Sequence, residues 1–103
     1  MFTGKREKQF KEPELTAVFT TSYVILDKKP ITYVTHDAED GAWQFFSQDQ
    51  FQNYEDVAMI VSIKEIVAID STLLELADMP VGYYAIRATE NDQWVIRSQN
   101  DID

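Results

Sequence analysis

The order of apolar and polar positions predicts short strands in the first half of the chain. Residues 16–21 and 31–36 are rich in β-branched and aromatic side chains, which favour extended backbone. Residues 43–46 place three aromatic side chains in four positions and fit a third strand. Because the acidic residues 37–41 form a turn between the second and third strands, we expect these two strands to pair antiparallel.

The segments around these strands have less decisive patterns. Residues 23–26 either continue the first strand after a kink or form a short turn. Residues 47–56 are polar and amide-rich, and form either a loop or a single helical turn. Residues 57–61 make a short apolar run that is typical of a buried strand.

Two helix starts follow this run. Ser62 and Glu65 have the spacing of a capping box, in which the serine hydroxyl accepts from a free N–H of the first turn and the glutamate reaches back. This spacing predicts a helix over residues 62–69. Asp70 offers a second cap, and the leucines after it predict a short helix over residues 71–77.

The last part of the chain predicts a hairpin, because the strand-like residues 83–88 and 93–97 flank a polar turn. We therefore expect an α+β fold, with a mainly antiparallel sheet of about five or six short strands and one or two short helices. The chain divides into a flexible N-terminal arm at 1–15, a single domain at 16–97 and a polar tail at 98–103.

Charge is unevenly distributed along this pattern. Of the 103 residues, 18 are Asp or Glu and 9 are Lys or Arg, which gives a net charge of −9. Residues 30–63 contain six acids and no Lys or Arg. Such a charge opposes nucleic-acid backbones and anionic membranes and attracts basic partners. We therefore expect no binding to nucleic acid or to a membrane.

Cysteine is absent, and His36 is the only histidine. The missing cysteine excludes disulfides, thiolate metal sites and thiol catalysis, so a metal site would consist mainly of carboxylates. No apolar stretch has the length of a membrane span, and no apolar region of a signal peptide follows the charged first residues. These features favour a cytoplasmic location, and we expect no cofactor.

No motif indicates catalysis or specific metal binding. Residues 37–41 superficially resemble a calcium loop, but Gln48 stands where an EF-hand has its bidentate Glu. His36 beside Asp37 is a conceivable proton-shuttling pair, yet no nucleophile motif accompanies it. Phosphate-binding loops need clustered glycines, and the three glycines here lie far apart. We therefore do not expect an enzyme.

The aromatic residues have two interpretations. Trp43 and its neighbours are numerous enough to dominate a small core. Alternatively, some aromatic residues, Phe51 and Tyr54 foremost, border an acidic interface, because aromatic anchors beside charge are typical of protein-binding hot spots. On this second interpretation the candidate partner-binding residues are Asp37, Glu39, Asp40, Asp49, Phe51, Tyr54, Glu55 and Asp56.

Several motifs follow one another in an order that resembles a known family. They are Asp40-Gly41-Ala42-Trp43-Gln44-Phe45-Phe46, Val61-Ser62-Ile63-Lys64-Glu65-Ile66, Ile69-Asp70-Ser71-Thr72-Leu73-Leu74 and Met79-Pro80-Val81-Gly82-Tyr83-Tyr84. Over residues 16–97 the chain resembles a small bacterial domain family assigned as immunity proteins of polymorphic-toxin systems. That family has a Gly-Trp-x-Phe-Phe signature, whereas here Ala42 separates the glycine from the tryptophan.

The resemblance implies a β-rich fold with short helices and a cognate protein toxin as partner, and it transfers no catalytic or binding residues. We therefore expect a small acidic binding protein that neutralises a toxin by direct occlusion, and the charge favours a basic toxin. The alternative is a small-ligand-binding or regulatory domain with an aromatic pocket under Trp43 and Trp94. An enzyme built around His36 is a third hypothesis, and the oligomeric state stays open.

Overall fold

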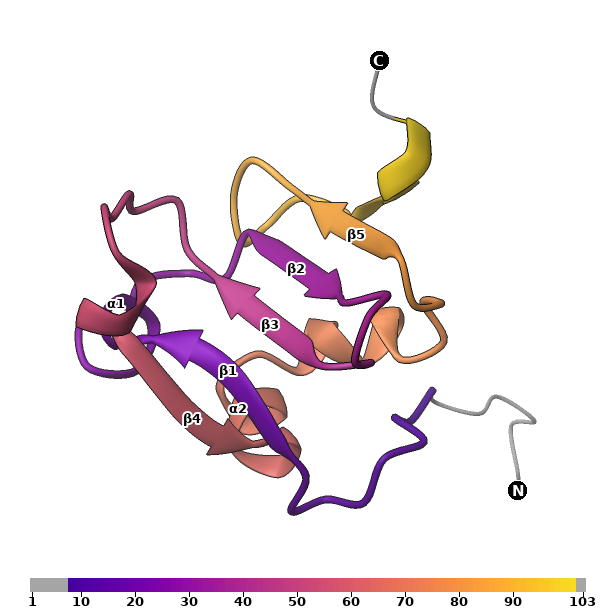
Figure 1. The fold of residues 1–103 in the computed structure, drawn as a ribbon, viewed down its shortest axis with the longest axis horizontal. Helices are drawn as coiled ribbons and strands as arrows, with labels where there is room; N and C mark the ends of the chain where they lie inside the picture. The colour runs from indigo at the N-terminus through magenta and orange to yellow at the C-terminus, as the bar shows by residue number, and fades with distance from the viewer. Residues whose placement is uncertain (1–7, 102–103) are drawn as a thin grey trace.

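The computed structural model describes residues 8–101, which form one six-stranded sheet with short helices. The strands lie in the order β4-β1-β3-β2-β5-β6, and Figure 1 shows the first five from lower left to upper right. The strands are β1 (Ala17–Thr21), β2 (Tyr33–His36), β3 (Trp43–Phe46), β4 (Ala58–Ser62), β5 (Tyr83–Ile86) and β6 (Val95–Ser98). The helical segments are α1 (Ser22–Ile25), η1 (Tyr54–Asp56), α2 (Ile63–Ile69), η2 (Ser71–Leu76) and η3 (Gln99–Asp101).

The predicted α+β class is confirmed, and so is the antiparallel pairing of β2 with β3. The sheet is mixed, because β1 and β3 pair in parallel while the other neighbouring strands pair antiparallel. Strand β3 folds back from β2 and inserts between β1 and β2, and this insertion makes it parallel to β1. The predicted polar tail, 98–103, begins inside β6 and continues as η3, while residues 102–103 lie outside the described part.

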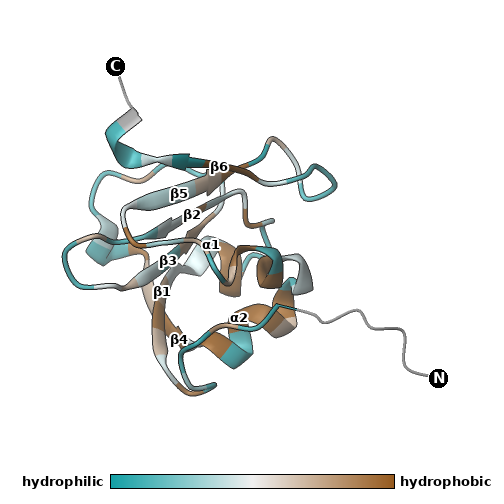
Figure 2. Ribbon diagram, turned by 90° about the vertical axis from the view of Figure 1, so that its right-hand side faces the viewer, coloured by the Kyte–Doolittle hydropathy of each residue, from teal (hydrophilic) through white to brown (hydrophobic). Residues whose placement is uncertain are grey.

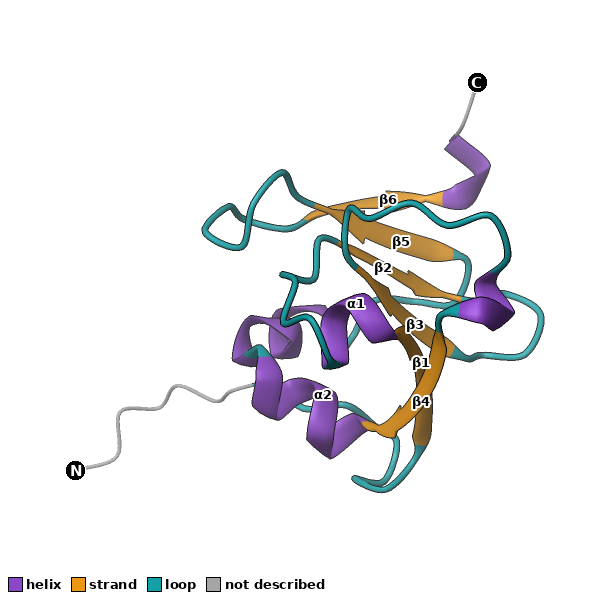
Figure 3. Cartoon of the chain, turned by 90° about the vertical axis from the view of Figure 1, so that its left-hand side faces the viewer, coloured by secondary structure: helices purple, strands orange, loops and turns teal. Residues whose placement is uncertain are grey.

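The helices α1 and α2 lie on one side of the sheet, whereas η1 lies on the other side (Figure 3). Much of the ribbon of α2 is hydrophobic, which Figure 2 shows in brown beside the strands. The core between sheet and helices consists of fully buried apolar side chains. Its largest members are Trp43, Phe45, Ile31, Ile66, Leu73 and Leu76. Trp43 is therefore a core residue, as the first of the two interpretations expects.

Segment 23–26 is a helical turn and does not continue the first strand. It belongs to α1, which begins directly after β1. The side chain of Thr21 accepts a hydrogen bond from the N–H of Val24, so this threonine caps the helix. Of the two alternatives for residues 23–26, a continued strand or a short turn, the structure has the turn, and the Thr21 hydroxyl caps it.

The capping box at Ser62 is present. Its hydroxyl accepts from the N–H of Glu65 at 3.1 Å, and the Glu65 carboxylate accepts from the N–H of Ser62 at 3.0 Å. The predicted helix over 62–69 is α2. The second predicted helix, 71–77, is present as the 3₁₀ helix η2, with Asp70 as its N-cap.

The sequence predicts a buried strand at 57–61. A strand forms there, but the prediction that it is buried is wrong. Strand β4 forms there, but it lies at the edge of the sheet and pairs only with β1. Ile60 is 62% exposed, and Ala58 is also exposed. Successive side chains of a strand point to opposite faces, and in β4 Met59 and Val61 point to the core side while Ala58 and Ile60 point to solvent.

Arg87 is a buried cation that joins four parts of the fold. Its guanidinium donates to the carbonyl of Ile31 at 2.8 and 3.0 Å and to the hydroxyl of Thr72 at 3.0 Å. It also forms an ion pair with Asp70 and lies 3.9 Å from the centre of the Trp94 ring. These contacts tie the end of β5 to the start of β2, to η2 and to the segment before β6.

Residues 8–15, which belong to the predicted flexible arm, contact the core. The ring of Phe10 meets that of Trp43 edge to face, with 4.9 Å between centroids. The indole N–H of Trp43 donates to the Glu12 carboxylate at 3.0 Å. This part of the arm therefore covers the most prominent core residue, whereas residues 1–7 lie outside the described part.

Candidate protein-binding face

The side of the sheet opposite α1 and α2 carries an unusual share of aromatic side chains. Val34 and Phe45 are fully buried and point toward the helices, so their strand neighbours Tyr33 and Phe46 point the other way. Tyr33 and Phe46 are also cross-strand partners. Tyr84 pairs with the residue two positions beyond Tyr33 and therefore shares its face.

Five rings on this side form a connected group, which we call the aromatic cluster. Its members are Tyr33, Phe46, Phe51, Tyr54 and Tyr84. The centroid separations are 5.9 Å for Tyr33 and Phe46, 6.0 Å for Tyr33 and Tyr84, and 6.2 Å for Phe46 and Phe51. Tyr54 lies 5.9 Å from Phe46 and 5.8 Å from Phe51. These spacings fall within the range that aromatic pairs prefer.

The loop after β3 folds over the sheet and carries two members of the cluster. The Tyr54 hydroxyl donates to the carbonyl of Thr20 at 2.7 Å, which fixes η1 against β1. Phe51 is held by its ring contacts with Phe46 and Tyr54. Phe51 and Tyr33 are each 38% exposed, so the cluster is assembled without being covered.

Burial also affects the phenol groups of the cluster. Desolvation raises the pKa of Tyr33, and the neighbouring Tyr84 raises it further. Desolvation likewise raises the pKa of Tyr54. Both phenols are therefore neutral at neutral pH, and the Tyr54 hydroxyl is the donor to the Thr20 carbonyl.

Exposed aliphatic residues extend the cluster toward both edges of the sheet. By register, Ile60 lies opposite Phe19 on the β4 side, and Ile86 and Val95 lie beyond Tyr33 on the other side. All three aliphatic side chains are exposed. Among the strand positions that point to this face, Arg97 on β6 is the one charged side chain. Contiguous exposed apolar side chains of this kind make this face the candidate interaction site.

The structure divides the predicted acidic residues into two groups at opposite ends of the sheet. The first group, Asp37, Glu39 and Asp40, lies in the turn between β2 and β3, at the right in Figure 1. Asp37 accepts from the N–H of Glu39 at 2.8 Å, and Asp40 accepts from the N–H of Ala42 at 2.9 Å. Two of these carboxylates therefore stabilise the turn.

The second group, Asp49, Glu55 and Asp56, lies in the loop that carries Phe51 and Tyr54, at the upper left in Figure 1. Asp49 accepts from the hydroxyl of Ser47 at 2.7 Å. Glu55 and Asp56 are exposed, and within residues 8–101 neither carboxylate has a hydrogen-bond or ion-pair partner. In the chain, the second group flanks the cluster residues Phe51 and Tyr54, whereas the first group begins two residues after Thr35, the register partner of Tyr84.

The structure assigns His36 a packing role. Its ring stacks on Trp43 with 3.9 Å between centroids, and Nδ1 lies 2.8 Å from the carbonyl oxygen of Met79. Because a carbonyl only accepts, Nδ1 carries the proton. Within residues 8–101 no hydrogen bond joins His36 to Asp37, and Oδ1 of Asp37 accepts from the N–H of Glu39 in the turn.

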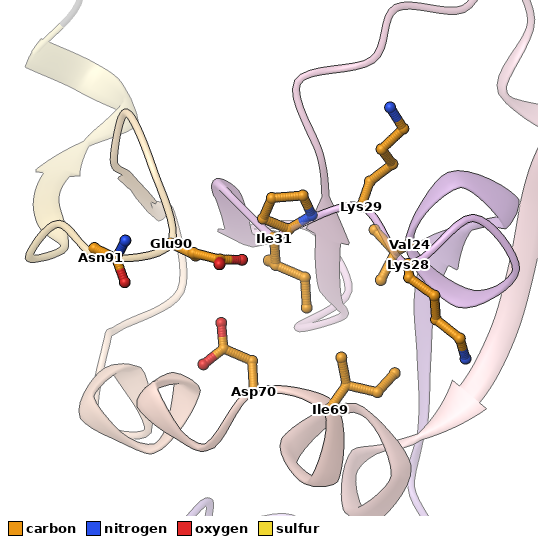
Figure 4. A pocket seen from close by; sticks show the side chains of 9 residues that line it. Val24, Lys28, Lys29, Ile31, Ile69, Asp70, Glu90 and Asn91 are labelled. Atoms are coloured by element: carbon orange, nitrogen blue, oxygen red, sulfur yellow. The ribbon is translucent and has the colours of Figure 1, made fainter.

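Two cavities lie at the end of the sheet where the second acidic group is found. One, of about 450 Å³, is shown in Figure 4. Lys28 and Lys29 line one side of it and Glu90 the other, while Asp70 rises from below. The Asp70 carboxylate is already engaged by Arg87, so it has little capacity for a ligand. A second cavity, of about 640 Å³, adjoins the first and shares Lys29 and Glu90 with it.

Neither cavity is lined by a tryptophan. Trp43 is covered by Phe10 and His36, and Trp94 packs against Arg87. The arrangement therefore does not favour the alternative of a ligand pocket beneath the two tryptophans.

Among residues 8–101, no cluster of three or more His, Cys, Asp or Glu side chains has the arrangement of a metal site. In the same residues, no helix is both long and apolar enough to span a membrane.

Sequence reasoning identified Phe51 and Tyr54 but missed Tyr33, Phe46 and Tyr84 as members of the exposed face. The signal was in the alternation of the strands. Tyr33 shares its face with Thr35, and Phe46 shares its face with Gln44.

Comparison with known proteins connects the chain to a protein family. Residues 18–97 match the family model described as Immunity protein Imm33 domain. No curated protein and no solved structure matches the chain.

Proposed function

Since the chain belongs to the Imm33 immunity protein family, as its motifs predict, we propose that it neutralises a cognate toxin by binding it directly and covering its active surface. The toxin is a protein made by the same cell or its relatives, and the chain acts on it in the cytoplasm. The protein is a binder and performs no chemical step on the toxin.

The aromatic cluster is the observation that carries this proposal. Tyr33 and Phe51 expose apolar ring surface on the face that α1 and α2 leave free. Partly exposed tyrosines and phenylalanines held by their neighbours lose little side-chain entropy on binding. They are therefore suitable anchors for a partner surface, and burying them supplies the main favourable free energy of association.

Charge supports a basic toxin as the partner. The net charge of −9 attracts a cationic surface over a distance of about one Debye length, roughly 8–10 Å. Glu55 and Asp56 beside the cluster place part of this charge where a docked toxin would meet it. We propose that the second acidic group orients the toxin and that the first group mainly holds the β2–β3 turn.

Co-expression with the toxin encoded beside the gene tests the proposal. The chain should restore growth of cells that produce the toxin, and the two purified proteins should elute together from a sizing column. Restored growth without a complex would point to an indirect mechanism. Absence of both would contradict the proposed function.

A further inference from the structure

The outer edge of β4 is a second exposed feature, distinct from the aromatic cluster. In Figure 1, β4 lies at the lower-left margin of the sheet with no strand beyond it. Strand β4 contains no Lys, no Pro and no charged residue. Edge strands of soluble proteins are usually blunted by such residues, because their free backbone groups pair readily with another chain.

The hydrogen-bond register identifies the free backbone groups. Ser22 donates to the carbonyl of Val57 at 2.8 Å, and Ile63 donates to the carbonyl of Thr16 at 2.9 Å. Hydrogen-bonded residues alternate along an antiparallel pair. Residues 57, 59, 61 and 63 therefore face β1, while 58, 60 and 62 direct their N–H and C=O groups to the free edge.

One of these outward groups is already occupied. The N–H of Ser62 donates to the Glu65 carboxylate in the capping box. The N–H and C=O groups of Ala58 and Ile60 remain, and within residues 8–101 no hydrogen bond occupies them. They are spaced to accept a short extended segment.

We infer that β4 pairs with an extended segment of the cognate toxin, which adds a seventh strand to the sheet; this inference rests on the proposed function. Charge favours a toxin segment over a second copy of this chain as the strand that pairs with β4. A second copy of this chain would bring another net charge of −9 to the edge, whereas the toxin segment carries Lys or Arg at the end beside Asp56.

Side-chain positions support the same partner. Ile60 points to the face opposite α1 and α2 and lies opposite Phe19, so it continues the apolar surface of the aromatic cluster to the edge. A paired toxin segment with an apolar residue beside Ile60 would bury both. The backbone would supply affinity and the side chains specificity, as in other cases of strand addition. The other edge strand, β6, carries the cationic side chain of Arg97, whereas β4 carries no charged side chain.

Two substitutions of Ile60 distinguish the contribution of its backbone N–H to toxin binding from that of its side chain. Ile60→Pro removes the outward N–H and leaves the hydrogen bonds to β1 intact, because proline is tolerated on the free side of an edge strand. Ile60→Thr keeps the N–H and a β-branched side chain. With the toxin encoded beside the gene as the probe, Ile60→Pro should bind at least tenfold more weakly than Ile60→Thr.

Amide hydrogen exchange of the wild-type protein provides an independent measurement. If Ile60→Pro disturbs the fold, this measurement alone tests the inference. Toxin binding should slow exchange at the Ala58 and Ile60 amides at least tenfold, while Met59 and Val61, bonded to β1, change little. If the toxin binds but the two variants bind equally and these amides stay fast, strand pairing is overturned and the proposed function survives. If the wild type does not bind, both fail. If the Ala58 and Ile60 amides are protected without toxin and the protein forms dimers, the edge of β4 pairs with a second copy of the chain, and the inference is overturned.

Discussion

The rings of Tyr33 and Phe46 stack across β2 and β3 with 5.9 Å between centroids and an angle of 28° between their planes. They do so on the face of the sheet that α1 and α2 leave free. A stacked pair in that position is fixed by the sheet and still open to solvent. This relationship makes the face suited to recognition and leads to the predictions below.

Truncating the exposed rings should weaken toxin binding without unfolding the protein. Tyr33→Ala and Phe51→Ala each remove a ring that is 38% exposed, and each should cost about 1–2 kcal/mol of binding free energy. Ile69→Ala, on helix α2, removes a half-exposed side chain from the opposite side and serves as the control. Calorimetric titration against the toxin measures all three. Equal affinities for the three variants would rule out the aromatic cluster as the anchor.

Charge reversal should distinguish the two acidic groups. Glu55→Lys and Glu39→Lys change the net charge equally, but Glu55 directly follows the cluster residue Tyr54 in η1, whereas Glu39 lies in the β2–β3 turn. We expect Glu55→Lys to slow association markedly and to reduce its salt dependence, since steering depends on charge near the docking surface. Stopped-flow association rates at low and high salt provide the comparison. A larger effect from Glu39→Lys would place the docking surface at the β2–β3 turn instead.

Loss of the buried arginine should destabilise the fold. The Arg87 side chain is 1% exposed, and Arg87→Met would leave Oδ2 of Asp70 without its cationic partner and the Ile31 carbonyl without the guanidinium donors. Breaking a buried pair from one side costs about 3–5 kcal/mol. Arg97→Met on the exposed β6 strand should change stability by less than about 0.5 kcal/mol. Urea unfolding measures both, and similar midpoints for the two variants would show that Arg87 is not a structural hub.

Stability should fall in alkaline solution partly through Tyr33. Its pKa in the folded protein is raised, so the unfolded chain loses the phenol proton first as the pH rises above about 10. The contribution of this group is therefore complete below the unfolded pKa and is lost as pH rises through the folded pKa. Tyr33→Phe should make the decline in unfolding free energy between pH 9 and about 11.5 shallower. An unchanged slope would mean that Tyr33 is not desolvated.

Local patterns in the sequence predict most of the helices and strands. They do not predict contacts between residues that lie far apart in the chain. The Ser62 capping box predicts α2 because both of its hydrogen bonds join residues three apart. The role of Arg87 depends on Ile31, 56 residues away, and no spacing rule indicates such a contact. Strand β4 has the composition of a buried strand, but it lies at the edge because it pairs with β1 alone, and this pairing joins residues about 40 positions apart.

The sequence predicts only part of the candidate site. Phe51 and Tyr54 stood out because they interrupt a polar segment, and both belong to the aromatic cluster. The acidic residues appeared as one region because they are close in sequence. Strand β3 separates them by its full length, so that Glu39 and Glu55 lie at opposite ends of the sheet.

Hydroxyl-radical footprinting of the complex tests the central claim most directly, because it reports which side chains the toxin covers. We predict that oxidation of Tyr33, Phe51 and Tyr84 falls several-fold when the toxin is bound, while oxidation of Leu26 and Ile69, exposed elsewhere, is unchanged. Protection of Ile69 with undiminished oxidation of Tyr33 and Phe51 would contradict the account, because the toxin would then dock on the helical side of the molecule.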